Sequence, residues 1–105
     1  MPTVDFKGKS FNIDEDGFID DFNNWSQEWV DLVKESEGVK ELTEEHWKVI
    51  NFLQDYYKKN GIAPMVRVLA KVTGFNLKHI YELFPSGPAK GACKMAGLPK
   101  PTGCV

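Results

Sequence analysis

The chain has 105 residues, of which 42% are hydrophobic and 27% charged, an ordinary composition for one small globular domain. No run of residues reaches the ~18–20 apolar positions of a membrane span, and the polar start lacks the features of a secretory signal. We therefore expect a cytoplasmic protein without direct membrane insertion. Cysteines are kept reduced in that compartment, so the two cysteines of the chain favour redox chemistry or group carriage over a structural disulfide.

The net charge of −2 hides a strong asymmetry between the two halves of the chain. Residues 1–55 carry five Lys against fourteen Asp or Glu, a net charge of −9, whereas residues 56–105 carry eight Lys or Arg and the single acid Glu82, a net charge of +7. A basic half that contains both cysteines would attract anions or an acidic partner surface. Mutual neutralisation within one small domain explains the asymmetry equally well.

The N-terminal segment predicts a short β-hairpin, because apolar and polar residues alternate over residues 4–13 around a central glycine. A lone hairpin is only marginally stable, so we expect Phe6, Phe11 and Ile13 to pack against helices. Residues 14–17, Asp-Glu-Asp-Gly, resemble the start of a calcium loop. Their glycine comes two positions early and the later ligands are missing, so we predict a turn.

Helical periodicity and terminator residues predict helices over about residues 24–37, 43–60, 64–72, 76–84 and 88–96. Thr43 is the expected N-cap of the second helix, and Pro64 fits the first turn of the third. The apolar positions expected to face the core are Trp25, Trp29, Leu32, Val33, Trp47, Ile50, Leu53, Tyr57, Val66, Leu69, Ala70, Leu77, Ile80, Leu83 and Phe84. The predicted fold class is mainly α, a small helical bundle with an N-terminal β-hairpin and a flexible C-terminal arm.

Both cysteines lie near the C-terminus, with Cys93 on the last predicted helix and Cys104 as the second-last residue. Prolines and a glycine precede Cys104, which favours an extended segment with little bulk beside the sulfur. We therefore assign residues 1–97 to a single helical domain and residues 98–105 to a mobile arm. An arm of this kind is suited to carrying a thiol into the pocket of another protein.

The spacing of the two thiols favours a bond that can open and close. Fully extended, the eleven-residue separation spans roughly 36–40 Å, whereas a disulfide requires Cα atoms within about 4.4–6.8 Å. Closing such a loop offsets roughly 3 kcal/mol of unfolded-chain entropy, which flexibility of the arm can cancel. Cys104 can thus point outward or fold back to Cys93. A structural disulfide and two incidental thiols remain the alternatives.

The chemistry of the pair follows from mobility and nearby charge. Only a thiolate attacks, and Lys90, Lys94 and Lys100 along the segment would favour that form. Cys104, on the mobile tip, is the expected first nucleophile, and Cys93, anchored near the fold, is the expected resolving thiol. These two are the predicted catalytic residues.

Residues 70–83 also match the outline of a DNA-binding helix-turn-helix, with the small Ala70, the turn at Gly74, and apolar residues at Ile80 and Leu83. The chain is not basic as a whole, however, and Glu82 would face phosphates. A helix pair used only for packing is the favoured interpretation over DNA binding.

No metal or cofactor site is predicted within the chain. His46 and His79 lie far apart in the sequence, and the two cysteines do not have zinc-ligand spacing. No Ser-His-Asp or paired-carboxylate arrangement can be assigned. The thiols are therefore the remaining candidates for chemistry.

Two segments resemble the DsrC family, whose members are often called the gamma subunit of dissimilatory sulfite reductase. Residues 84–105, ending Pro-Lys-Pro-Thr-Gly-Cys104-Val, resemble the C-terminal arm of that family, and residues 55–67 resemble its central signature. A sister branch, the TusE sulfur-relay proteins of tRNA thiolation, generally keeps only the penultimate cysteine. The presence of Cys93 places the chain nearer the sulfite-reductase branch.

The resemblance implies a sulfur carrier that acts as co-substrate of the reductase alpha and beta subunits and is not catalytic alone. In this role Cys104 enters the reductase channel, where siroheme and an iron–sulfur cluster of the partner reduce sulfite. Attack by Cys93 on the sulfur carried out by Cys104 then gives a trisulfide. A membrane electron-transfer complex reduces the trisulfide and releases sulfide. The alternatives are a TusE-like relay that uses Cys104 alone and a helix-turn-helix DNA-binding regulator.

Overall fold

A computed structural model of the chain describes residues 3–98. Its elements in chain order are β1 (Thr3–Phe6), β2 (Lys9–Asn12), the 3-10 helix η1 (Phe22–Asn24), α1 (Gln27–Glu37), α2 (Glu44–Asn60), α3 (Val66–Thr73), α4 (Leu77–Leu83) and the π-helix η2 (Pro88–Cys93). The predicted class, mainly helical with an N-terminal hairpin, is confirmed. Within the described part of the chain, no helix is both long enough and apolar enough to cross a bilayer.

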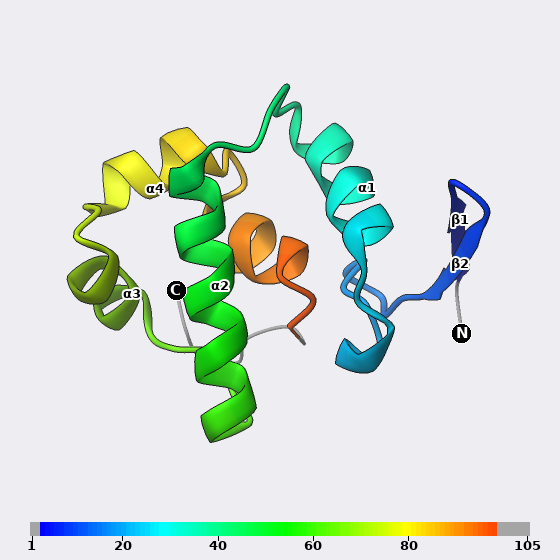
Figure 1. Ribbon diagram of the computed structural model, residues 1–105, viewed down its shortest axis with the longest axis horizontal. Coiled ribbons are helices and arrows are strands. Elements are labelled where there is room, and N and C mark those ends of the chain that lie inside the picture. The colour runs from blue at the N-terminus through cyan, green and yellow to red at the C-terminus, as the bar shows by residue number, and fades with distance from the viewer. Residues whose placement is uncertain (1–2, 99–105) are drawn as a thin grey trace.

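The short helix η2 occupies the middle of the bundle (Figure 1). It lies between α1 and α2, the hairpin lies beyond α1, and α3 and α4 lie on the other side of α2. The largest fully buried side chains come from α1 to α4, from the loop after β2, and from the residues that follow α4 and η2: Trp29, Phe18, Phe84, Ile50, Leu53, Leu69, Ile80, Met95, Leu98, Val30, Val33 and Val49. The end of the described chain is therefore part of the core.

The hairpin is tied to α1 by an aromatic contact and by two ion pairs, the second of which joins Lys9 to Glu28 at 3.3 Å. Its turn places Lys7 and Gly8 at φ 50° and 81°, as a tight two-residue hairpin turn requires. Phe11 is buried with its ring edge against Trp29, at a centroid distance of 5.2 Å. Lys7 Nζ donates to Asp31 at 3.0 Å. The prediction that the hairpin leans on a helix is confirmed.

The acidic segment after β2 is a turn, as predicted. The Asp14 carboxylate accepts the backbone N–H groups of Asp16 and Phe18, each at 2.9 Å. The Gly17 N–H closes the turn onto the Asp14 carbonyl at 3.1 Å. Across residues 3–98, no group of three or more acidic, His or Cys side chains is arranged to hold a metal ion.

Several predicted boundaries and faces were wrong. Helix α3 begins at Val66 after the N-cap Met65, so Pro64 lies in the preceding loop and not in the first turn. Trp25 precedes α1, which begins at Gln27. Leu77 is 47% exposed because it is the first residue of α4, and the buried face of that helix begins one turn later at Ile80.

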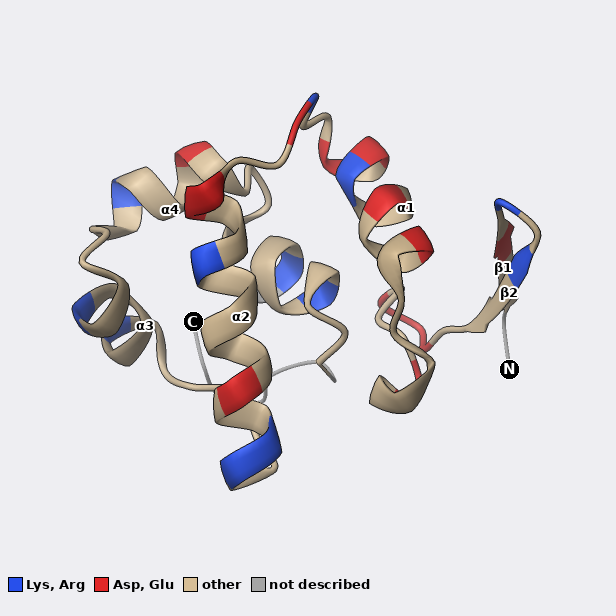
Figure 2. Cartoon of the chain, viewed as in Figure 1, with Lys and Arg blue, Asp and Glu red and all other residues tan. Residues whose placement is uncertain are grey.

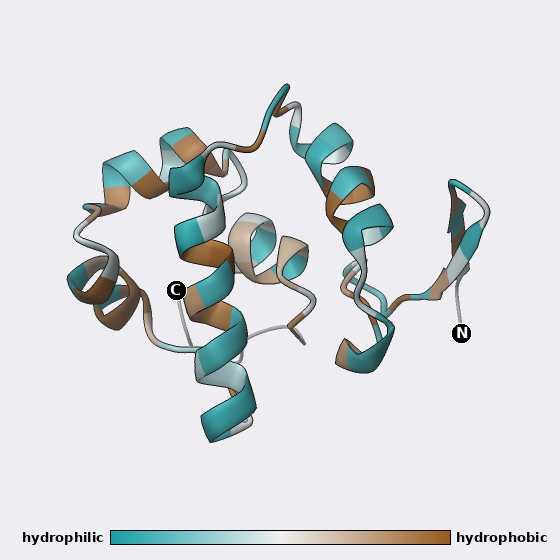
Figure 3. Ribbon diagram, viewed as in Figure 1, coloured by the Kyte–Doolittle hydropathy of each residue, from teal (hydrophilic) through white to brown (hydrophobic). Residues whose placement is uncertain are grey.

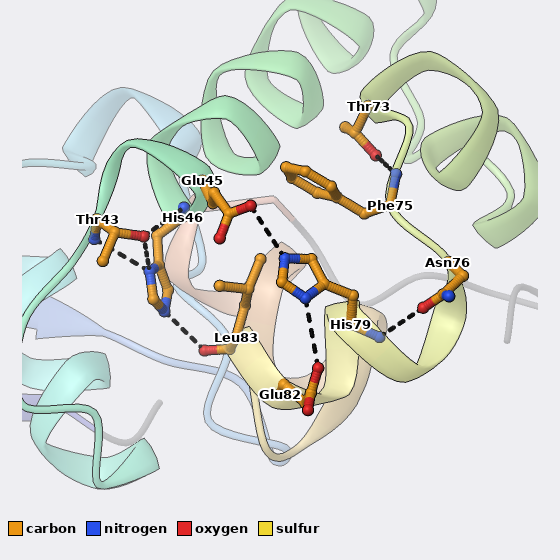
Figure 4. A network of polar contacts seen from close by, with 9 residues as sticks. All are labelled: Thr43, Glu45, His46, Thr73, Phe75, Asn76, His79, Glu82 and Leu83. Atoms are coloured by element: carbon orange, nitrogen blue, oxygen red, sulfur yellow. Dashed lines mark hydrogen bonds and ion pairs between the residues drawn. The ribbon is translucent and has the colours of Figure 1, made fainter.

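Two histidines fasten α4 to the start of α2 (Figure 4). His46 is buried; its Nδ1 accepts the Thr43 backbone N–H at 3.0 Å, and its Nε2 lies 2.9 Å from the Leu83 carbonyl oxygen. An N–H only donates and a carbonyl only accepts, so the ring is neutral with its proton on Nε2. Burial lowers the pKa of His46 below its usual value.

His79 has the opposite electrostatic surroundings. Its Nε2 lies 3.1 Å from a Glu45 carboxylate oxygen, and its Nδ1 lies 3.3 Å from a Glu82 oxygen. The hydrogen bond to Glu45, with a smaller contribution from Glu82, raises the pKa of His79. One histidine of the pair is thus held neutral and the other is stabilised in its charged form.

The two histidines predict opposite dependences of stability on pH. In His79→Gln, the remaining His46 contributes stability that is complete above its ordinary pKa of 6.5 and is lost as the pH falls, because the unfolded chain takes up the proton first. In His46→Gln, His79 contributes stability that is complete below 6.5 and is lost as the pH rises through its raised pKa.

Urea unfolding of both variants between about pH 5 and 8 measures the two slopes. The double variant His46→Gln/His79→Gln supplies the background from the carboxylates. Slopes of the same sign in the two single variants, after this background is subtracted, would contradict the assigned charge states.

Candidate functional site

Cys93 is the last residue of η2 and is only 4% exposed. Its neighbours along the chain, Ala92, Met95, Ala96 and Leu98, are each fully buried. The expected position of Cys93 on an anchored helix is therefore confirmed, and its depth in the core is new information. Leu98, which is predicted to belong to the arm, is part of the core.

Cys104 and the expected arm beyond Leu98 lie outside the described residues, and the predicted role of Cys104 stays a prediction.

A tight reversal of the chain follows Cys93. The Gly97 N–H donates to the Lys94 carbonyl and the Leu98 N–H donates to the Cys93 carbonyl, each at 3.1 Å. This pair of bonds, with Gly97 at φ 84°, is the Schellman arrangement that ends many helices. It fixes the direction in which the chain leaves the residue that bears the thiol.

Three consecutive carbonyls in this reversal are held by side chains from other parts of the bundle. The donors come from α1, from a tryptophan two residues before it, and from α2. The bonds are Trp29 Nε1 to Lys94 O at 2.7 Å, Trp25 Nε1 to Met95 O at 2.9 Å, and Gln54 Nε2 to Ala96 O at 3.0 Å. We call these three side chains the carbonyl anchor.

The carbonyl anchor satisfies polar groups that would otherwise be costly. A buried carbonyl without a partner costs about 1–3 kcal/mol, and a helix end has several such groups. Helical periodicity predicts Trp25 and Trp29 as apolar core residues and does not reveal this function. The available signal was the indole N–H, which usually finds an acceptor when a Trp is buried. Which acceptor it finds depends on contacts 65 and 70 residues away.

The other end of η2 is held by Glu37 of α1. One of its carboxylate oxygens accepts the Ser86 N–H at 2.9 Å, and the other accepts the Ser86 hydroxyl. Gly91 passes close to the same carboxylate: a Cβ there would lie 2.7 Å from Glu37 Oε1 and 2.9 Å from Phe84 Cβ. The thiol-bearing helix is thus fixed at both ends and packed without room for a larger residue at 91.

Residues 5–105 match the family model described as DsrC-like protein. The chain belongs to the DsrC family. It is 70% identical over 105 residues, all of both chains, to the gamma subunit of dissimilatory-type sulfite reductase of Nitratidesulfovibrio vulgaris (strain Hildenborough). It is 37% identical to the sulfurtransferase TusE of Escherichia coli (strain K12), over 95% of this chain and 97% of TusE.

Solved DsrC-family structures have the same fold. A crystal structure of dissimilatory sulfite reductase I matches with a TM-score of 0.93 and 65% identity, over 99% of this chain and 100% of the other. The oxidised gamma subunit of dissimilatory sulfite reductase from Archaeoglobus fulgidus matches with a TM-score of 0.87 and 48% identity, again over 99% and 100%. The recognition of the family from the two sequence segments is therefore confirmed.

The lysines expected to favour a thiolate in this DsrC-family chain differ in position. Lys90 is exposed on η2, and Lys94 is half-buried. The amine of Lys94 lies against Gly17 of the acidic turn, where a Cβ would be only 3.0 Å from Nζ. The positive charge of Lys94 therefore lies beside the acidic turn Asp14–Gly17. At this point the structure favours neutralisation of opposite charges within the domain over a basic surface that attracts a partner.

The closeness of Gly97 to the anchor gives a stability prediction with a matched control. Gly38 ends α1 at φ 75° with open space around it, so Gly38→Ala adds only backbone strain of about 1–2 kcal/mol. Gly97→Ala has the same strain and also places Cβ 2.5 Å from Trp25 Cδ1. We expect about 1–3 kcal/mol of further destabilisation from this overlap. Urea unfolding measures both, and equal losses would mean that the reversal is not rigidly anchored.

Proposed function

We propose that this chain is a sulfur-carrying gamma subunit of a dissimilatory sulfite reductase and acts as a co-substrate of its alpha and beta subunits in the cytoplasm. The observation that carries the proposal is the 70% identity to such a gamma subunit over the whole of both chains. The second cysteine agrees with it, because Cys93 is held at the end of a helix whose position is set by both flanking helices.

In the proposed reaction Cys104 receives sulfur inside the reductase. Sulfite, the Cys104 thiol, two electrons and four protons give a Cys104 Sγ–S–OH group and two waters. The electrons come through the siroheme and iron–sulfur cluster that we assign to the reductase. The thiol of Cys93 then attacks the outer sulfur, the hydroxyl leaves as water, and a Cys104–S–Cys93 trisulfide forms. A membrane electron-transfer complex supplies four electrons and four protons, which restore both thiols and release sulfide.

The anchored position of Cys93 supports its role as the resolving thiol. The first five steps from Cys93 toward Cys104 end at Leu98, where the chain is fixed by the reversal and the core. Only six steps remain from Leu98 to Cys104, a reach of roughly 20 Å. Shortening the flexible part of a loop lowers the entropic cost of closing it. A fixed Cys93 therefore raises the effective concentration of one thiol near the other.

A TusE-like sulfur relay is the second candidate, and the 37% identity to TusE favours it. That function transfers a persulfide from one cysteine to the next protein and needs only Cys104. The two candidates therefore differ in what the loss of Cys93 does.

Turnover with sulfite and a working sulfite reductase separates the roles of the two cysteines. Cys104→Ser should take up no sulfur, because an alcohol offers almost no anion at neutral pH and cannot form the sulfur–sulfur bond. Cys93→Ser should still be loaded, but the added sulfur should stay on Cys104. The wild-type monomer should gain one sulfur and lose two hydrogens, as measured by intact-mass analysis.

Loading of Cys104→Ser at Cys93 would reverse the assignment. Sulfur that stays as an unbridged adduct on Cys104 in both the wild type and Cys93→Ser, or sulfur passed on by both to a relay acceptor at the same rate, would favour the TusE-like function instead.

A further inference from the structure

The exposed large apolar side chains of the described chain come from one stretch of the sequence, which includes α3 and most of α4. Throughout residues 3–98 the large apolar residues that are exposed all fall between positions 62 and 81: Ile62 63%, Met65 49%, Val72 56%, Leu77 47% and Tyr81 48%. We call these five residues, together with Arg67, Lys71 and Lys78, the α3–α4 face. Concentrated exposure of this kind on a small domain marks an interaction site more often than chance scatter does.

Helix geometry places these residues on the outward sides of their elements. Met65 and Val72 are seven residues apart, two turns of helix, and Leu77 and Tyr81 are four apart, about one turn. The inward sides are taken by other residues, since Leu69 and Ile80 are buried. Figure 3 shows apolar and polar positions interleaved along both helices.

The charge of the α3–α4 face comes mainly from basic residues, with the acid Glu82 of α4 beside it. Residues 56–81 contain five Lys or Arg and no Asp or Glu. Arg67, Lys71 and Lys78 are exposed, and Figure 2 shows no acidic position on α3. Glu82 lies on α4 four residues after Lys78, and its carboxylate, like that of Glu45, contacts His79. The face therefore combines apolar anchors with the exposed cations of α3, Arg67 and Lys71.

We propose that the α3–α4 face is the docking surface for the sulfite reductase and that it fits an apolar groove rimmed by carboxylates on that partner. This rests on the proposed function and adds to it a binding surface separate from the thiols. The C-terminal residues 99–105 of the chain itself do not suit the face, because they contain Lys100 and no acid. Nucleic acid does not suit it either, because interfaces with phosphate backbones are more polar and use few large apolar side chains.

The face also adjoins the helix that bears Cys93. The Tyr81 ring packs on Gly87, where a Cβ would lie 2.8 Å from the ring, and η2 begins at the next residue, Pro88. A partner that covers Tyr81 therefore lies beside the start of η2, the helix that ends at Cys93. Reversible docking through the face would hold Cys104 at a high local concentration near the reductase. The segment that bears Cys104 then needs little affinity of its own for the reductase before the covalent step.

Equilibrium binding to the reductase tests the proposal. The probe is the sulfite reductase of Nitratidesulfovibrio vulgaris freed of its own gamma subunit, and every chain carries Cys104→Ala so that covalent capture does not contribute. Val72→Ser/Leu77→Ser should weaken binding about tenfold or more, since buried apolar anchors dominate such interfaces. Arg67→Glu/Lys71→Glu should weaken it at low salt and much less at high salt. Lys40→Glu, an exposed lysine on the loop before α2, is the control and should bind like the parent.

Four outcomes would overturn the proposal in distinguishable ways. If both face variants bind with unchanged affinity while the chain with Cys104 is still loaded with sulfur, the α3–α4 face is not the docking surface. The proposed function would still hold. If the wild type neither binds the reductase nor is loaded with sulfur, both the docking surface and the proposed function are wrong. Binding of a duplex of about 30 base pairs that only the charge variant loses, with reductase binding unchanged, would assign the face to DNA. Loss of a wild-type dimer in the face variants, again with reductase binding unchanged, would assign it to self-association.

Discussion

The hydrogen bond from the Trp29 indole to the Lys94 carbonyl, 2.7 Å long, is the contact on which most of this architecture depends. Trp29 is fully buried, and its ring also meets Phe11 of the hairpin. One side chain therefore joins the N-terminal strands, the first long helix and the reversal after Cys93. Trp25 and Gln54 add two parallel bonds to the next two carbonyls, so the end of the described chain is held from two directions.

This anchoring serves a chemical need of the proposed carrier. In the proposed reaction the Cys104 thiol has to reach the reductase, and the Cys93 thiol has to keep a fixed position in the domain. A folded domain of this size is stable by only about 5–15 kcal/mol, so mobility near a reactive residue has to be kept from spreading into the core. The reversal at Gly97 and the burial of Leu98 provide such a boundary. The α3–α4 face then supplies affinity without using either thiol.

Local rules predicted much of the fold. The alternation in residues 4–13 identified the hairpin, and Thr43 was correctly placed as the N-cap of α2. Long-range polar contacts were not predictable in this way. His46 occupies a capping position where Glu or Gln is usual, so its burial and its bond to Leu83, 37 residues away, gave no local signal.

The segment around Cys93 shows the same difference between local features, which the sequence predicts, and long-range contacts, which it does not. The sequence placed Cys93 on the last helix, but the anchor that fixes it joins residues far apart in the chain. The sequence pattern does not identify Leu98 as a core residue, because an apolar residue after a helix has no periodic partner. The family resemblance supplied the chemistry of the thiols, and the contacts of the fold supplied the reason why one of them is fixed.

The most direct test of this account is thermal unfolding of two variants, one ending at Lys100 and one full-length with Leu98→Ala, each followed by assay of sulfur loading. The account predicts that the shortened chain melts within about 2 °C of the wild type but takes up no sulfur, because its fold is complete and Cys104 is gone. Leu98→Ala should lose about 2–5 kcal/mol of stability, since it removes a fully buried side chain. A shortened chain that melts as low as Leu98→Ala would show that the last residues hold the fold together, and would contradict the account.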